Sequence, residues 1–351
     1  MDGPLSPGGD RIRVTVVVVV FGDEPWLERS IDAILGSVDV DVELVLVENG
    51  GSESVIAGAA ADARVRVVRP GHNSGFAMGC DLGVAAGTAP LVALVNPDAI
   101  VEPDALRALC ATASSPGIGL ATASIRLADR PDRLNCAGNL VTVTGISWAD
   151  HFGELADRFP EQFDVVGASG AGLAIRRSLW DDLGGFNESF FAYWEDTELS
   201  IRAIQRGWRV VYEPDAVIVH RYSFSRNPSK FFLLERNRSV TALTCFSTRH
   251  LMAIAPLSAV IEIGLLVMAV RQRRTTHRRT ARQYTSTTRP RTAGGVSASS
   301  MFRGDMLVES RSSSRDSSSV HAACTSRRRV AMSRRWVHNH RQARTFSRSQ
   351  R

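Results

Sequence analysis

The sequence predicts an α/β domain built on a mostly parallel central sheet. Residues 13–22, RVTVVVVVFG, form a continuous β-branched run, which is typical of a strand buried on both faces of a parallel sheet. Residues 24–35 follow with apolar positions at a helical spacing, and Pro25 is tolerated in the first turn of such a helix. Strand and helix patterns keep alternating to about residue 98, which indicates an α/β arrangement.

The next elements of this first half follow in the same order. We expect strands at residues 42–50, 64–70 and 90–98, a helical stretch ending near residue 61, and a helix over residues 75–87. Ligands of mostly parallel sheets bind at the carboxyl ends of the strands. Polar residues at those ends are therefore the first candidates for a functional site.

The second half contains one unclear region and several distinct patterns. Residues 126–165 show no consistent period, and we assign no element there. A short helix is expected over residues 177–183, and a longer one from Asp196 to Gly207. Residues 208–220 predict a strand pair, joined by a turn at residues 213–215.

Charge divides the chain near residue 270. Residues 271–351 contain 20 Arg, no Lys and three acidic residues, a net charge of +17. Since the whole chain carries +6, residues 1–270 carry −11. The tail lacks the apolar content needed for a core, so we expect it to be disordered, as we do residues 1–10. A natural basic arm is one explanation; a reading-frame shift near Arg271 in a GC-rich gene is the one we favour.

Residues 251–270, LMAIAPLSAVIEIGLLVMAV, are long enough to cross a bilayer but contain Pro256 and Glu262. We interpret them as a core or membrane-surface helix pair, with a true span as the less favoured alternative. The five cysteines are scattered and form no CxxC pair, so neither a disulfide framework nor a zinc site is indicated. This usage favours a reducing, cytoplasmic setting.

Polar residues follow three of the predicted strands, at Phe21-Gly22-Asp23, Glu48-Asn49-Gly50-Gly51 and Asn96-Pro97-Asp98. Each alone is compatible with an ordinary turn, but together they indicate one site at an edge of the sheet. No G-x-G-x-x-G motif follows the first strand, which argues against a dinucleotide site. No G-x-x-x-x-G-K-[ST] motif occurs, and Lys230 is the only lysine, so a P-loop is excluded.

Three further positions could carry chemistry. Asp98 follows an apolar strand, where a carboxylate can bind the Mg²⁺ or Mn²⁺ that holds a diphosphate. His220 also ends a strand, although a lone histidine is more often structural than a ligand. In FFAYWEDTELS, Glu195 and Asp196 follow four aromatic residues. Asp196 is a candidate helix N-cap and also a candidate for a carboxylate whose pKa is raised by desolvation; the local sequence does not separate the two interpretations, and they are not exclusive.

Taken together, six segments of the chain resemble, in order and spacing, the family 2 glycosyltransferases of the GT-A fold, and especially their bacterial rhamnosyltransferase-like branch. The resemblance covers roughly residues 11–270. Any single segment would be weak evidence, but six in order make chance agreement improbable. The segments are VTVVVVVFG, LVLVENGGSES, HNSGFAMGCDLG, LVALVNPDAIVEPDAL, the stretch from Gly170 to His220, and FFLLERNRSV.

The resemblance implies a role for each residue that matches a family motif. The implied roles are nucleotide-sugar binding by Val20, Phe21, Glu48, Asn73, Gly75, Asp81 and Asn96, metal binding by Asp98 and His220, acceptor contact by Glu195 and Trp194, and general-base catalysis by Asp196. Two departures from the family pattern leave the base preference open. Phe21-Gly22 stands where a Tyr-Asn or similar pair is usual, and Glu48 stands where an Asp is usual.

The implied activity is inverting, metal-dependent sugar transfer from a nucleoside-diphosphate sugar, such as dTDP-rhamnose or a UDP-sugar, to a cell-surface glycan or lipid-linked acceptor. Mg²⁺ or Mn²⁺ is the expected cofactor. We expect a GT-A domain over residues 11–230, membrane-associated helices over 231–270, and a location at the inner face of the cell membrane. The alternatives are a nucleic-acid-binding protein using the Arg-rich tail, which we disfavour, and a glycosyltransferase-like protein that does not turn over.

Overall fold

The structure is a computed structural model that describes residues 11–221 and 230–287. The predicted disordered N-terminus and most of the predicted tail lie outside the described residues. Four parallel strands form one half of the central sheet, in the order β3-β2-β1-β4. Their bounds are Ile12–Val20 for β1, Val40–Glu48 for β2, Val65–Val68 for β3 and Leu91–Val95 for β4.

The other half of the sheet continues the order as β11-β6-β12-β10. β12 runs parallel to β6, whereas β11 lies antiparallel between β4 and β6. Two short strands complete the sheet, β5 against β12 and β7 against β6. The bounds are Ala99–Val101 for β5, Ile118–Leu127 for β6, Arg130–Cys136 for β7, Phe163–Asp164 for β10, Gly172–Arg176 for β11 and Arg209–His220 for β12.

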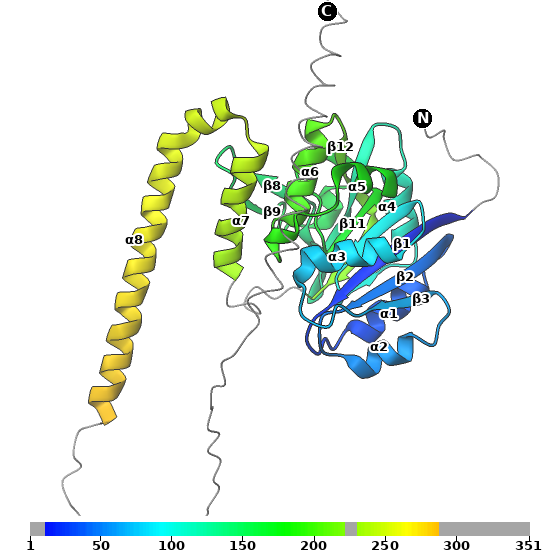
Figure 1. Cartoon of the computed structure of the whole chain (residues 1–351), viewed down its shortest axis with the longest axis horizontal. Coiled ribbons are helices and arrows are strands. Elements are labelled where there is room, and N and C mark those ends of the chain that lie inside the picture. The colour runs from blue at the N-terminus through cyan, green and yellow to red at the C-terminus, as the bar shows by residue number, and fades with distance from the viewer. Residues whose placement is uncertain (1–10, 222–229, 288–351) are drawn as a thin grey trace, which may run out of the picture. The chain divides into compact units, whose positions relative to one another are not determined.

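Helices cover both faces of this sheet (Figure 1). Because side chains alternate along a strand, Val16 and Val18 of β1 face one helix layer, and Val17 and Val19 face the other. The first layer contains α1 (Leu27–Leu35), α2 (Glu53–Ala59) and α4 (Ala105–Ala113), and the second contains α3 (Gly75–Ala86), α5 (Arg177–Leu183) and α6 (Glu195–Gln205). The predicted α/β fold with a mostly parallel sheet is confirmed.

The predicted strand pair over residues 208–220 was wrong. β12 is one strand that stays paired with β6, with a register shift between Glu213 and Val217. The Glu213 carboxylate is buried and accepts hydrogen bonds from Thr112 and Gln162. These contacts hold the irregular stretch within the sheet, so Pro214 lies in a bulge, where a missing backbone donor is tolerated.

The region to which we assigned no element contains short pieces of structure. Strands β8 (Asn139–Val141) and β9 (Ser147–Ala149) form a hairpin, followed by a 3₁₀ turn over Ala156–Arg158. A second 3₁₀ turn, Glu188–Phe190, precedes α6. None of these pieces is long enough to give a clear period in the sequence.

Two C-terminal helices follow, α7 (Lys230–Cys245) and α8 (Thr248–Thr287). The predicted helix pair over residues 251–270 was wrong, because α8 is one continuous helix that includes Pro256. Its apolar stretch is not buried in a core, and the membrane-surface alternative stays a prediction. α8 also continues past residue 270, where we placed the start of the tail.

Candidate active site

The polar ends of the parallel strands converge on one edge of the sheet. The backbone N–H of Gly22, after β1, donates to the carbonyl of Gly50, after β2, at 2.6 Å. The backbone N–H of Arg221, at the end of β12, donates to the carbonyl of Asp98 at 3.0 Å. The Arg221 guanidinium also binds Glu24, in the loop after β1, at 2.7 Å. The predicted convergence of strand ends is therefore present.

Asp98 and His220 lie in direct contact at this edge. His220 Nε2 is 3.1 Å from Asp98 Oδ1, and both residues are 7% exposed. His220 Nδ1 is 2.9 Å from the side-chain oxygen of Asn135, which fixes the orientation of the ring. Asn96 Nδ2 lies 3.4 Å from His220 Nε2. Sequence reasoning missed Asn135, because it lies in the region without a clear period.

The chemistry of this pair suits a hard divalent cation. A carboxylate oxygen is a preferred ligand of Mn²⁺ and Mg²⁺, whereas an imidazole nitrogen is more typical of transition metals, so the pair fits Mn²⁺ better than Mg²⁺; phosphate oxygens and water would complete the shell. Across residues 11–221 and 230–287, no cluster of three or more His, Cys, Asp and Glu side chains could hold a metal ion. Asp98 and His220 are therefore candidate ligands for such a cation.

Asp196 lies in the first turn of α6, and its carboxylate binds two parts of the chain. Oδ2 accepts the backbone N–H of Gly170 at 2.8 Å, and Oδ1 accepts the N–H and hydroxyl of Thr197 at 2.6 and 3.1 Å. The interpretation of Asp196 as a helix N-cap was wrong. Trp194 occupies the N-cap position, and its side chain makes no capping hydrogen bond.

The two adjacent carboxylates differ in access to solvent. Asp196 is partly exposed, whereas Glu195 is 4% exposed and its Oε2 has no hydrogen-bond partner. Burial raises the pKa of both carboxyl groups, that of Glu195 well above its usual range. Trp194 is also buried, at 5% exposed. Both residues predicted to contact an acceptor, Glu195 and Trp194, are thus buried, and their acceptor contact stays a prediction.

One short loop connects Asp196 with the Asp98–His220 pair. Gly170 donates its N–H to Asp196, and the carbonyl of the next residue, Ala171, accepts the N–H of Asn96 at 3.4 Å. Asn96 in turn lies beside His220. Two consecutive residues thus place a partly exposed carboxylate and a buried Asp–His pair at the same edge.

The structure gives each predicted nucleotide-binding residue a distinct setting. Val20 is buried at the end of β1, and Phe21 after it is 64% exposed. Glu48, at the end of β2, forms an ion pair with Arg69 at 2.8 Å. Asn73 accepts the backbone N–H of Gly75 at 3.0 Å. An exposed aromatic ring beside a strand-end carboxylate is a reasonable surface for a nucleotide base, and these roles remain predictions.

Gly75 and Asn49 join β2 to the start of α3. Gly75 has φ +79°, and a Cβ there would collide with the Phe191 carbonyl. Only glycine therefore permits this close approach. The buried Asn49 side chain donates to the Gly75 carbonyl at 2.9 Å and accepts the Ser74 hydroxyl at 2.8 Å. The sequence alone predicts only a turn at Asn49, although its position directly after a buried strand could have indicated this structural role.

The backbone before Asp196 is strained at three positions. Phe191, Tyr193 and Trp194 have φ values of +64°, +69° and +76°, although none is glycine. Each such residue costs about 1–3 kcal/mol and persists only where its surroundings hold it. Strain of this kind is common at functional sites, and it lies immediately before the acidic pair.

Asp81 is a partly buried carboxylate that binds the backbone. It accepts the N–H of Phe186 at 3.0 Å. Burial raises its pKa from 3.8 to about 7. Between pH 4 and 7 the folded protein holds a proton that the unfolded chain has released, so the free energy of unfolding falls as pH rises through this window.

We expect Asp81→Asn to remove this fall of the unfolding free energy with pH and to raise the free energy of unfolding at pH 8 by about 1–3 kcal/mol. This range is lower than the full pKa shift would give, because solvent screens the partly exposed carboxylate. Urea unfolding at pH 5 and pH 8 measures the effect. Asp132→Asn, at a largely exposed position, should leave the pH slope unchanged. A wild-type slope in Asp81→Asn would contradict the prediction.

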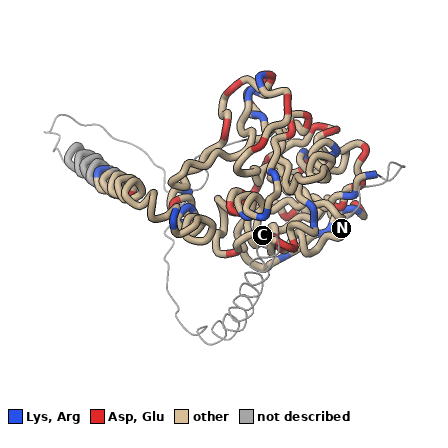
Figure 2. Tube along the Cα trace, turned by 90° about the horizontal axis from the view of Figure 1, so that it is seen from above, with Lys and Arg blue, Asp and Glu red and all other residues tan. Residues whose placement is uncertain are grey.

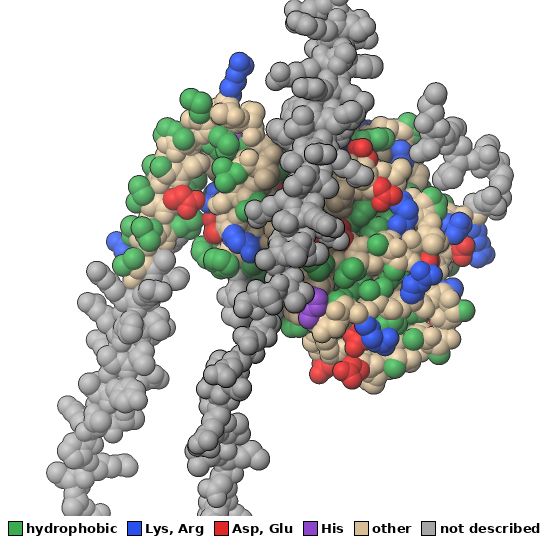
Figure 3. All heavy atoms as spheres, in the orientation of Figure 1, with side chains coloured by type: hydrophobic (Ala, Val, Ile, Leu, Met, Phe, Trp, Pro, Cys, Tyr) green, Lys and Arg blue, Asp and Glu red, His purple; other side chains and the backbone are tan. Residues whose placement is uncertain are grey.

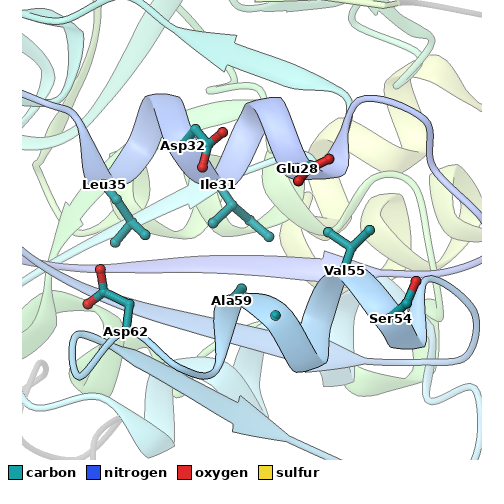
Figure 4. Close-up of a pocket in the computed structure, with 9 residues that line it drawn as sticks. Glu28, Ile31, Asp32, Leu35, Ser54, Val55, Ala59 and Asp62 are labelled. Carbon is teal, nitrogen blue, oxygen red and sulfur yellow. The ribbon is translucent and has the colours of Figure 1, made fainter.

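A hollow of about 610 Å³ lies between α1 and α2, away from these residues (Figure 4). Its lining includes the carboxylates Glu28, Asp32 and Asp62 and no basic side chain. Such a surface would repel a diphosphate, so it is not the site defined by the strand ends.

The structure resembles the crystal structure of GalNAc-T7 with UDP, GalNAc and Mn²⁺, with a TM-score of 0.54 and 17% identity, covering 62% of this chain and 45% of that one. The architecture is therefore that of the GT-A fold.

The sequence places the chain within that class. A model of the Glycosyltransferase like family 2 matches residues 11–242, so the chain belongs to this family. An N-acetylglucosaminyl-diphospho-decaprenol L-rhamnosyltransferase of Mycobacterium tuberculosis is 30% identical over 240 residues, which are 61% of this chain and 78% of that protein. Uncharacterized protein y4gI of Sinorhizobium fredii is 31% identical over 231 residues, and the chain spans only a quarter of its length.

Proposed function

We propose that the protein is an inverting, divalent-metal-dependent glycosyltransferase that uses a nucleoside-diphosphate sugar. The observation that carries this proposal is the shared loop at Gly170 and Ala171, which brings Asp196 and the Asp98–His220 pair to one edge of the sheet. Inverting transfer needs two such centres: a base for the acceptor hydroxyl and a group that stabilises the leaving diphosphate.

Each residue has a defined task in this reaction. Asp196 would take the proton of the acceptor hydroxyl while the hydroxyl oxygen bonds to the anomeric carbon and the bond from that carbon to the diphosphate breaks. The Gly170 and Thr197 N–H groups hold the Asp196 carboxylate in place. Asp98 and His220 would hold the cation, and Asn135 fixes the His220 ring. The bound cation would act as a Lewis acid toward the leaving diphosphate.

The similar mycobacterial rhamnosyltransferase suggests the substrates. Its name describes transfer of L-rhamnose to N-acetylglucosaminyl-diphospho-decaprenol, a sugar on a lipid diphosphate. We therefore favour dTDP-rhamnose as donor, with a UDP-sugar second, and a lipid-linked or cell-surface glycan as acceptor. The Mn²⁺ in the GalNAc-T7 structure supports a cation at the Asp98–His220 pair. A cytoplasmic location at the inner membrane face would give access to such acceptors.

A donor screen tests the proposal. Purified protein is incubated with dTDP-rhamnose or UDP-sugars, a lipid-diphosphate acceptor, and Mn²⁺, Mg²⁺ or EDTA, and the anomeric configuration of the product is determined by NMR. We expect metal-dependent transfer with inversion. Donor binding without turnover would instead identify a glycosyltransferase-like protein that is inactive, and retention of configuration would contradict the mechanism.

Helix α8 offers a surface for contact with the membrane. Residues Thr248–Val267 are long and apolar enough to span a bilayer, with a mean hydropathy of 1.9. Within residues 251–270, Glu262 is the only charged residue, and it pairs with Arg238 of α7. Figure 2 marks few charges along this part of α8, and Figure 3 shows hydrophobic side chains on it. Val260 and Ile263 are 66% and 61% exposed.

We expect the double variant Val260→Asp and Ile263→Asp to lower partitioning into phosphatidylglycerol-containing vesicles at least tenfold, because burying each apolar side chain contributes about 1.5–3 kcal/mol. Vesicle co-flotation measures the effect. Val38→Asp, at another exposed apolar position, should bind as the wild type does. Equal flotation of the double variant and the wild type would contradict a role for α8.

A further inference from the structure

Helix α7 contacts the strained segment before Asp196 through a buried asparagine. Asn237 is 0% exposed, and its side-chain Nδ2 lies 3.0, 3.0 and 2.7 Å from the carbonyl oxygens of Phe190, Ala192 and Tyr193. An amide group has two N–H bonds, so with three acceptors one N–H is shared. A single side chain thus binds three carbonyls within four consecutive residues.

Arg236 sets the orientation of that amide. Its Nε donates to Asn237 Oδ1 at 2.9 Å, so the Asn237 NH₂ group is directed toward the carbonyls. The other end of the guanidinium donates to the carbonyls of Ser189 and Phe190 at 2.6 and 2.8 Å. Arg236 and Asn237 therefore act as one unit against the segment.

The opposite side of the segment is held by α3. The backbone N–H groups of Phe76 and Ala77 donate to the Phe191 carbonyl at 2.6 and 3.1 Å. These N–H groups belong to the first turn of a helix, where they have no partner within the helix. Each carbonyl from residue 189 to residue 193 therefore accepts a hydrogen bond from outside the segment.

We propose that Asn237 is a positioning residue for Asp196. The proposal rests on the proposed function, in which Asp196 is the general base. Left-handed backbone at Phe191, Tyr193 and Trp194 is unfavourable without external support. Loss of the Asn237 amide would let this segment relax and shift the start of α6, which carries Asp196. The hydrogen bonds of the Asn237 NH₂ group are to the segment before Asp196, so we expect its loss to act mainly on catalysis and less on donor binding.

The first test is a split between kcat and KM. Asn237→Ala should lower kcat about 100-fold, the typical cost of displacing a catalytic group by about 1 Å, and leave KM for the donor within about twofold. Ser239→Ala is the matched control on α7, because its exposed hydroxyl bonds only to the Glu235 carbonyl. An unchanged kcat in Asn237→Ala, or a raised donor KM with normal kcat, would overturn the proposal.

The second test asks whether the loss of kcat in Asn237→Ala is caused by a change in the backbone of the segment before Asp196. Glycine adopts the φ of Tyr193 without steric cost, so Tyr193→Gly should reduce the need for Asn237. In a double-mutant cycle, Asn237→Ala should cost at least tenfold less kcat in the Tyr193→Gly background than in the wild type. Equal costs in both backgrounds would overturn the proposal. If Asn237→Ala does not fold, the partly exposed Arg236→Ala should show the same pattern with a loss of about tenfold.

Hydrogen exchange gives a readout that needs no activity. In Asn237→Ala, the amides of Phe76 and Ala77, which donate to Phe191, should exchange at least tenfold faster, and Ser239→Ala should leave them unchanged. If the wild type transfers no sugar, the proposed function fails, while faster exchange still supports the role of Asn237 in holding the segment. Unchanged exchange in Asn237→Ala would overturn that role, whatever the activity of the wild type.

Discussion

Replacing Asp196 by Asn is expected to lower kcat by about 10²- to 10⁴-fold, the usual contribution of a general base. An Asn oxygen can still accept the N–H of Gly170 or of Thr197, so the loop and the helix start should keep their places. The affinity for the donor should stay within about twofold, because Asp196 does not belong to the Asp98–His220 pair. Steady-state kinetics and calorimetric titration of the nucleotide measure the two effects.

The pH profile adds a second signature of the base. Burial raises the pKa of Asp196, and a base must be deprotonated to act. Activity of the wild type should therefore fall, as the pH is lowered, at a higher pH than an ordinary aspartate would give. Asp196→Asn should lack this acid limb. Asp182→Asn, at an exposed carboxyl that pairs with Arg206, is the matched control; full activity in Asp196→Asn would remove Asp196 from the mechanism.

The second large effect is expected at the buried pair. Asp98→Ala and His220→Ala should each lower kcat/KM at least about 100-fold, or about 2.7 kcal/mol of transition-state stabilisation. Each removes one of the proposed metal ligands, so the affinity for Mn²⁺ in the presence of the nucleotide should fall as well. Isothermal titration with Mn²⁺ and the nucleotide diphosphate measures the binding term separately from turnover.

Asn135→Ala tests how far the orientation of His220 matters. Partners that orient a metal ligand typically contribute 10- to 100-fold in metal affinity, so this variant should fall between the wild type and His220→Ala. Chelation by EDTA should stop turnover of the wild type and have no further effect on Asp98→Ala. Undiminished turnover of the wild type after chelation would show that Asp98 and His220 do not act by binding a cation.

The fold could be predicted from the sequence where its patterns were long and regular. β1 was predictable because Val16 to Val20 form an unbroken β-branched run in a sheet covered on both faces. The position of Asp98 and His220 at strand ends could also be predicted from the sequence. Their contact could not, because it depends on the antiparallel pairing of β5, directly after Asp98, with the end of β12, which sets Ala99 opposite His220, and on the order of the whole sheet.

Sequence reasoning failed where tertiary contacts overrode local signals. Pro214 indicated a turn, yet the buried contacts of Glu213 keep the strand in the sheet. The acidic start of α6 suggested a cap at Asp196, yet the left-handed Trp194 takes that position. Asn237 lies in the segment FFLLERNRSV, but the sequence predicts no role for it. Its partners are backbone carbonyls more than 40 residues earlier in the chain.

The loop at Gly170 and Ala171 fixes the distance between the two centres of the proposed reaction. The N–H of Gly170 donates to the Asp196 carboxylate, and the carbonyl of Ala171 accepts the N–H of Asn96, whose side chain lies beside His220, so the two centres are linked through short side chains held by one loop. Acceptors of different size can therefore be accommodated only by parts of the chain outside this loop. Helix α8 can vary more readily than α7, whose Arg236 and Asn237 hold the segment before Asp196, while a single residue inserted at Gly170 would shift Asp196 relative to Asp98 and His220.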